Sequence, residues 1–167
     1  AAVDQLSGGP AADLLDQARD LDQALGDLRS AVQPLTHPIT PLRARRNTAQ
    51  YLLALLETCA YHARSLAATA ELLPTHPSIA ADPRLRQVCA RITGNIAVLI
   101  DHVADERATA AIETGPSIAS LLGADGTPGT PRYGRVTDRV LRHLQRLDES
   151  VVGLARPLRV PVPSPRR

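Results

Sequence analysis

The stretch that decides the fold is RRNTAQYLLALLETCAYHARSLAATAELL, residues 45–73, which contains neither Gly nor Pro. Its apolar side chains recur at alternating steps of four and three, a spacing that returns them to one face of an α-helix. They are Leu52, Leu56, Cys59, Ala63, Leu66, Ala70 and Leu73. At about 1.5 Å per residue, such a helix is about 40 Å long. We therefore predict one long core helix, against which the other helices pack.

The same spacing recurs in three further segments, residues 10–32, 83–112 and 132–154. The first is expected to end at Gln33-Pro34, because Pro cannot continue the hydrogen-bond ladder. The second is expected to start at Asp82-Pro83, with Asp as the cap and Pro in the first turn. The predicted core faces are Leu14, Ala18, Leu21, Leu25, Leu28 and Val32; Leu85, Val88, Ile92, Ile96, Leu99 and Val103; and Val136, Val140, Leu144, Leu147, Val151 and Leu154.

Four long helices without a strand pattern predict an all-α fold, an antiparallel up-and-down four-helix bundle. Residues 114–131 hold four Gly and three Pro, so we expect an exposed loop there, with one helical turn at residues 117–122. The predicted bundle spans residues 1–156 as a single domain. Residues 157–167 are rich in Pro and Arg and are expected to form an extended tail.

The composition limits the classes of function. The net charge of +2 gives no strong case for nucleic acid. The N-terminus lacks the basic start and apolar run of a signal peptide, and no apolar run reaches 18 residues. The abrupt start and the basic, Pro-rich end suggest a piece of a longer protein. Cys59 and Cys89 lie at levels about 12 Å apart in the predicted bundle, so we expect two free thiols and a reducing compartment.

Cys59 and His62 share a helix face and would supply two ligands of a zinc site, which needs at least a third. His102 lies about 12 Å from His62 in the predicted register, and the Glu-x-x-His motif of di-iron bundles is absent. We therefore predict neither metal nor other cofactor. Asp101 and Asp105 form an acidic cluster, which we interpret as a solvated helix face, with a metal or proton-handling role as the alternative. No catalytic motif is present, so we predict a protein that is not an enzyme.

A basic stripe runs along the predicted fourth helix: Arg132, Arg135, Arg139, Arg142 and Arg146. Three uses compete for it: ion pairs with the acidic first helix, contact with anionic lipid, and contact with nucleic acid phosphates. The first is the default interpretation for a bundle.

The antiparallel register of the first and fourth helices predicts that this stripe is split. Arg146 falls level with Asp20, and Arg139 with Asp27. Arg132 and Arg135 fall beyond the acids of the first helix, so we predict that they stay unpaired beside the loop. That end is the candidate contact with an anionic membrane surface.

Residues 24–72, ALGDLRSAVQPLTHPITPLRARRNTAQYLLALLETCAYHARSLAATAEL, resemble the soluble helical region of actinobacterial membrane proteins in the fusaric acid resistance (FUSC) family. These proteins are similar to aromatic acid exporters. The matching parts are Leu28-Arg29 leading to Pro34-Leu35-Thr36, an Arg cluster, and the helix from Tyr51 to Leu72 with CAYHAR at residues 59–64. The resemblance covers about residues 20–75.

The resemblance implies a cytoplasmic helical domain that accompanies membrane-spanning helices, while those helices carry the substrate path. Its expected role is therefore non-enzymatic, in assembly or regulation of a FUSC-like exporter. The expected partners are the remainder of a membrane protein or another subunit, and a homo-oligomer stays open. The alternatives are a stand-alone soluble helical bundle that binds another protein or a small ligand, and an enzyme with an unrecognised site.

Overall fold

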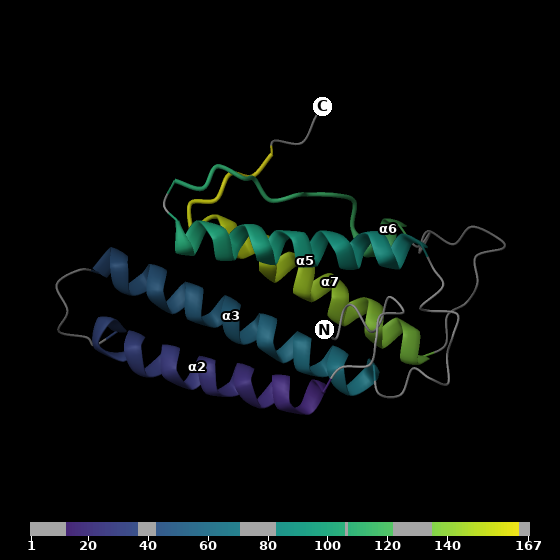
Figure 1. Ribbon diagram of the computed structural model, residues 1–167, viewed down its shortest axis with the longest axis horizontal. Helices are drawn as coiled ribbons and strands as arrows, with labels where there is room; N and C mark the ends of the chain where they lie inside the picture. Colours follow the sequence, from purple (N-terminus) through teal and green to yellow (C-terminus); the bar gives the residue numbers. More distant parts are fainter. Residues whose placement is uncertain (1–12, 37–42, 71–82, 106, 122–134, 164–167) are drawn as a thin grey trace.

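The computed structural model describes residues 13–36, 43–70, 83–105, 107–121 and 135–163. Four long helices dominate it: α2 (Leu14–Thr36), α3 (Arg43–Ala70), α5 (Pro83–Ala104) and α7 (Arg135–Ala155). One further turn, α6, spans Ile118–Leu121. No strand occurs in these ranges. The predicted fold class, an all-α bundle of four long helices, is confirmed (Figure 1). The order of directions differs from the predicted up-and-down one at α7 only.

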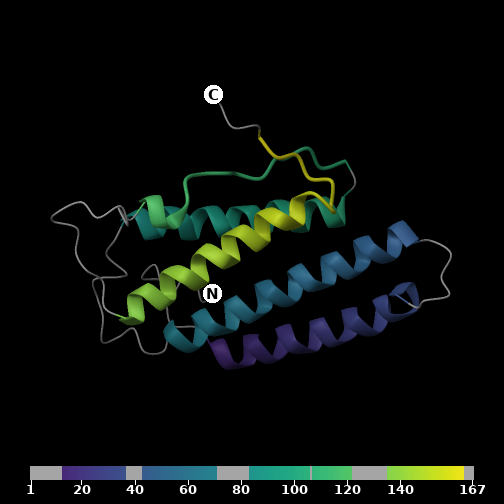
Figure 2. The same cartoon turned by 180° about the vertical axis from the view of Figure 1, so that it is seen from behind.

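Helix α3 is the centre of the bundle, as its uninterrupted sequence predicts. It packs against α2 on one side and against α7 on the other, and α7 in turn packs against α5 (Figures 1 and 2). Helix α3 runs antiparallel to all three of the other long helices. Helices α5 and α7 run in the same direction, because residues 107–117 first carry the chain back along α5 (Figure 1). We call residues 107–117 the return segment.

The main core lies between α3, α5 and α7. Leu66, Ile92 and Leu144 are its largest aliphatic side chains on these helices and are 0–1% exposed. The four-three spacing of α7 is confirmed, since five of its predicted core residues are buried: Val140, Leu144, Leu147, Val151 and Leu154. The side chain of Val136 lies outside those described.

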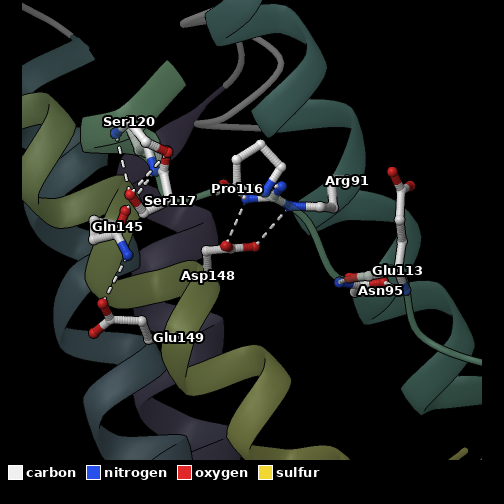
Figure 3. Close-up of polar contacts among 10 residues, drawn as sticks. Arg91, Asn95, Glu113, Pro116, Ser117, Ser120, Gln145, Asp148 and Glu149 are labelled. Atoms are coloured by element: carbon white, nitrogen blue, oxygen red, sulfur yellow. Dashed lines mark hydrogen bonds and ion pairs between the residues drawn. The ribbon is translucent and has the colours of Figure 1, made fainter. Parts of the chain in front are cut away.

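The core face of α5 is rotated from the predicted one. Ile96 is 38% exposed and Val103 is 69% exposed, although both were expected in the core. Asn95 is buried instead, at 2% exposed. Its side-chain oxygen accepts a hydrogen bond from the Glu113 N–H at 2.7 Å, and its side-chain nitrogen donates to the Glu113 carbonyl at 2.8 Å (Figure 3). A polar residue takes a core position here because the return segment satisfies it.

Two predicted helix ends are wrong. Helix α2 continues through Pro34 to Thr36, so the proline ring falls in its last turn, where few ladder bonds follow it. Helix α5 ends at Ala104 rather than at Ile112. There Asp105 stops the helix, because its side chain accepts a hydrogen bond from the Arg107 N–H at 2.9 Å. Such a local bond favours a turn over a further helical turn.

Three polar side chains fix the chain after α5. Besides Asn95, Arg91 donates to both carboxylate oxygens of Asp148, at 3.2 and 2.7 Å, and also to the Pro116 carbonyl. The side-chain oxygen of Gln145 accepts a bond from the Ile118 N–H at 2.7 Å (Figure 3).

The helical turn predicted at residues 117–122 is present as α6, but its Ile118 is buried rather than exposed. The rest of the predicted loop, residues 122–131, lies outside the described residues.

The first part of the predicted tail belongs to the bundle. Val160 is 4% exposed, and its N–H donates to the Ala155 carbonyl at 2.9 Å. Arg159 reverses the chain there with a φ of 58°, a conformation that usually favours Gly. The Pro161 carbonyl then accepts a bond from the Ile112 N–H at 3.1 Å, which ties the tail to the return segment. Residues 158–161 therefore differ from the extended tail expected for residues 157–167.

Candidate functional site: a basic pocket with paired histidines

One open pocket lies where α3 and α7 pack against each other, and its volume is about 550 Å³. Two residues of α3 and six of α7 line it: Tyr61, His62, Arg139, Arg142, His143, Gln145, Arg146 and Glu149. From α7, Arg139, Arg142, Arg146 and Glu149 recur at steps of three and four, so they form one face of the helix beside its apolar face. The pocket is therefore a direct result of the antiparallel packing of α3 on α7.

Two histidines meet in this pocket. The Nδ1 atoms of His62 and His143 lie 2.9 Å apart, a hydrogen-bond distance. The ring centroids are 5.2 Å apart, and the Tyr61 ring meets both imidazoles edge-on, at 5.1 and 6.1 Å. The bond requires one Nδ1 to carry a proton and the other to offer a lone pair. The pair can therefore hold only one positive charge while this bond lasts.

The surroundings favour neutral imidazoles. Burial lowers the pKa of His62 below its usual 6.5, and the positive charges of His143 and Arg146 lower it further, while Glu149 acts in the opposite direction. Burial also lowers the pKa of His143, with Arg139 and Arg142 adding to the effect. Both shifts have the same origin, since a partly buried site crowded with positive charge disfavours a further cation.

The arginines of the pocket keep most of their hydrogen-bonding capacity. Arg146 donates to Glu149 at 3.0 Å, and Gln145 donates to the same carboxylate at 2.7 Å. Arg142 makes a long bond of 3.5 Å to a carbonyl of its own helix. Arg139 is exposed and has no hydrogen bond or ion pair within the described part of the chain. The pocket therefore combines several free N–H donors with positive charge.

The predicted pairing of the basic stripe with the first helix is wrong. The acidic helix α2 contacts α3 and not α7, because α3 lies between them (Figures 1 and 2). Asp22 of α2 binds Arg64 of α3. Arg29 of α2 donates to Glu57 of α3 at 2.7 Å. Residues 139–146 of the stripe face the pocket instead.

The two predicted membrane-contact residues cannot be placed in this site. Arg132 lies outside the described residues. Arg135 is the first residue of α7, and its side chain is not among those described. The structure therefore brings Arg139, Arg142 and Arg146 of the stripe together with two histidines. The membrane contact at Arg132 and Arg135 stays a prediction.

The cysteine and acidic candidates do not join into a ligand set. Cys59 and Cys89 are not joined in a disulfide, as predicted, and burial raises the pKa of the Cys59 thiol to about 11. His62 turns to His143 rather than forming a site with Cys59. Asp101 is exposed on α5, and Asp105 is exposed directly after its end. Within the described ranges, no group of three His, Cys, Asp or Glu side chains is arranged to hold a metal ion.

Sequence reasoning considered His62 only as half of a metal site and did not consider His143. The signal was present, because Arg139, Arg142, His143 and Arg146 share one side of the predicted fourth helix. What was missing was the knowledge that this side lies against α3, at the level of His62.

Comparisons with known proteins do not indicate a family for this chain. No protein-family profile, curated protein or solved structure matches the chain. None of the described helices is long and apolar enough to cross a membrane.

Proposed function

We propose that the chain is a non-enzymatic accessory domain, acting in assembly, of a membrane exporter similar to the FUSC family. The resemblance of residues 20–75 supports this proposal, and those residues include most of α2 and all of α3. The observation that carries it further is a concentration of exposed apolar side chains at one end of the bundle.

That end carries four large apolar side chains exposed to solvent. Leu35, in the last turn of α2, is 48% exposed, and Tyr51, in the first third of α3, is 51% exposed. Ile100 and Val103, near the end of α5, are 61% and 69% exposed. These parts of α2, α3 and α5 lie at the same end of the molecule (Figures 1 and 2). Single exposed apolar residues are common, whereas neighbours such as Ile100 and Val103, three positions apart on one helix, form an exposed apolar face that is typical of a protein contact.

The carboxylates beside Ile100 and Val103 support one occupant, the cytoplasmic side of the exporter's membrane helices. Asp101 on α5 and Asp105 directly after it are exposed, beside Ile100 and Val103. Membrane helices are apolar and carry an excess of Lys and Arg at their cytoplasmic ends. A surface that combines exposed aliphatic side chains with carboxylates is complementary to both features.

The test begins with the full reading frame that encodes this chain. We expect apolar segments of about 20 residues beside the domain. In the complete protein, Ile100→Asp together with Val103→Asp should detach the domain from the membrane helices, measured as loss of cross-linking between them. Arg86→Asp, an exposed change on the first half of α5, is the matched control and should leave cross-linking unchanged. A reading frame without such segments would contradict the proposal.

The second candidate function is a stand-alone soluble helical bundle that binds a small ligand. The specific observation that favours it is the basic pocket at His62 and His143. The full reading frame distinguishes the two candidate functions, because only the accessory domain needs apolar segments beside it.

A further inference from the structure

The pocket between α3 and α7 has an unbalanced positive charge. Arg139, Arg142 and Arg146 stand against Glu149 alone, which gives a net of +2 before either histidine is protonated. The acids that the sequence offers for neutralising this stripe lie on α2, on the other side of α3. Like charges at steps of three and four on one helix repel each other, so the cluster destabilises the bundle unless an anion joins it.

We propose that this pocket binds a dianionic phosphate group, and that the His62–His143 pair takes up one proton as the phosphate binds. The inference does not depend on the proposed accessory role. A dianion matches the net charge of the pocket, and guanidinium groups bind phosphate oxygens through two parallel N–H bonds. The volume of about 550 Å³ exceeds the size of a bare phosphate, so the pocket has room for a phosphate monoester of a small organic molecule.

The histidine pair supplies a specific proton chemistry. With both rings neutral, the Nδ1–H of one imidazole donates to the Nδ1 of the other. The accepting ring carries its proton on Nε2, while the Nε2 of the donating ring has a lone pair that would repel an anion. One proton from solvent, added to that Nε2, turns both Nε2 atoms into donors and leaves the Nδ1 bond intact. A second proton would break the bond, so the uptake stops at one.

The neighbouring charges set the direction of the pH dependence. His62 is influenced by Arg146 and Glu149, and His143 by Arg139 and Arg142, all from α7, with Tyr61 beside both rings. Because the pKa of both histidines is lowered, both imidazole rings are neutral near pH 7 when the pocket holds no anion. A bound dianion stabilises the imidazolium and raises its pKa again. Affinity must therefore rise as the pH falls, by up to about tenfold per pH unit for one proton.

The experiment is isothermal titration of the full chain with sulfate and with inorganic phosphate, between about pH 7.5 and about pH 6. Sulfate is the decisive probe, because it stays a dianion across this range and only the protein titrates. We expect sulfate to bind more tightly at the lower pH. Repeating the titration in buffers of different ionisation enthalpy should show uptake of up to one proton per bound anion. Sulfate binding that does not change with pH, or no binding of either anion, would overturn the proposal.

Three variants separate the roles of the residues. His62→Gln/His143→Gln should abolish the proton uptake and most of the pH dependence, whereas Arg139→Gln should weaken binding about tenfold or more but keep the proton uptake. Arg86→Gln, an exposed charge on α5 outside the pocket, is the matched control and should bind as the parent does. If Arg86→Gln weakens binding as much as Arg139→Gln, the anion is held by general charge and the proposal fails.

A final experiment, sedimentation with lipid vesicles, distinguishes a free phosphate from a lipid headgroup. Vesicles of phosphatidylcholine with and without phosphatidic acid are sedimented with the protein at low salt. We expect no binding that depends on Arg139, because the proposed ligand is a soluble phosphate ester. Sedimentation with phosphatidic acid that Arg139→Gln abolishes and that free phosphate does not compete would overturn this assignment.

Discussion

Arg91 and Asp148 form an ion pair between α5 and α7 in which both side chains are almost entirely buried, at 6% and 12% exposed. Arg91 uses two nitrogens for the carboxylate and also binds the Pro116 carbonyl, so one guanidinium joins α5, α7 and the end of the return segment. This contact links residues 57 positions apart in the sequence. It sets the parallel register of α5 and α7.

The first prediction concerns this pair. Asp148→Leu should lower the free energy of unfolding by about 3–5 kcal/mol, because it leaves the Arg91 charge buried without a counter-ion. The measurement is urea unfolding followed by circular dichroism. The double variant Arg91→Met/Asp148→Leu should lower the free energy of unfolding by less than the sum of the two single changes, since it leaves no unpaired charge. Additive losses would mean that the two groups act independently.

The second prediction compares two neighbours on α5. Leu99 is 6% exposed, whereas Ile100 is 61% exposed. Leu99→Ala should cost about 2–5 kcal/mol of stability, as a buried leucine does, and Ile100→Ala should cost less than about 0.5 kcal/mol. Thermal and urea unfolding of the two variants measure the difference. Equal losses at both positions would contradict the burial of Leu99 and the exposure of Ile100.

The third prediction concerns the pH dependence of stability. Both His62 and His143 have a lowered pKa in the folded protein, so protonation favours the unfolded chain. Their contribution to stability is complete above the unfolded value of 6.5 and is lost as the pH falls through the lower folded values. Unfolding in urea across this range should show stability decreasing with acidification. His62→Gln/His143→Gln should have a shallower decrease than the parent, and an unchanged slope would show that these rings titrate alike in both states.

The fourth prediction concerns Cys59. With a pKa of about 11 in place of the usual 9.0, its thiol has about 100-fold less thiolate near pH 8 than an ordinary cysteine. Alkylation by iodoacetamide, followed by mass spectrometry of the peptide that contains Cys59, should therefore be about 100-fold slower in the folded protein than in concentrated urea. Equal rates in the two conditions would mean that the thiol is neither buried nor shifted.

The sequence allowed a good prediction of α3 and α7 and a poorer one of α5. The four-three spacing of Val140, Leu144 and Val151 is confirmed because an amphipathic face can bury only one side of a helix. On α5 the same rule placed Ile96 in the core and missed Asn95. An apolar period cannot reveal that a later segment, at Glu113, will satisfy a buried amide.

The candidate site was predicted only in part. Its arginines were recognised as a basic stripe, since they follow the helical period on one segment. Their assigned partners were wrong, and the His62–His143 contact was not foreseen. That contact joins residues 81 positions apart and depends on the register of α7 against α3.

The sequence by itself determined that the chain folds into four long helices, where most of them begin and end, and which face of each is apolar. Those properties follow from backbone hydrogen bonds and side-chain spacing within a few residues, so they are local. Only the tertiary structure decided that α3 separates α2 from α7, that α7 runs parallel to α5, and that Arg139 and His143 meet His62 instead of the acids of α2. The physical reason is that an apolar face specifies burial but not the identity of its partner. Here that identity is set by polar contacts such as Arg91 with Asp148 and Asn95 with Glu113.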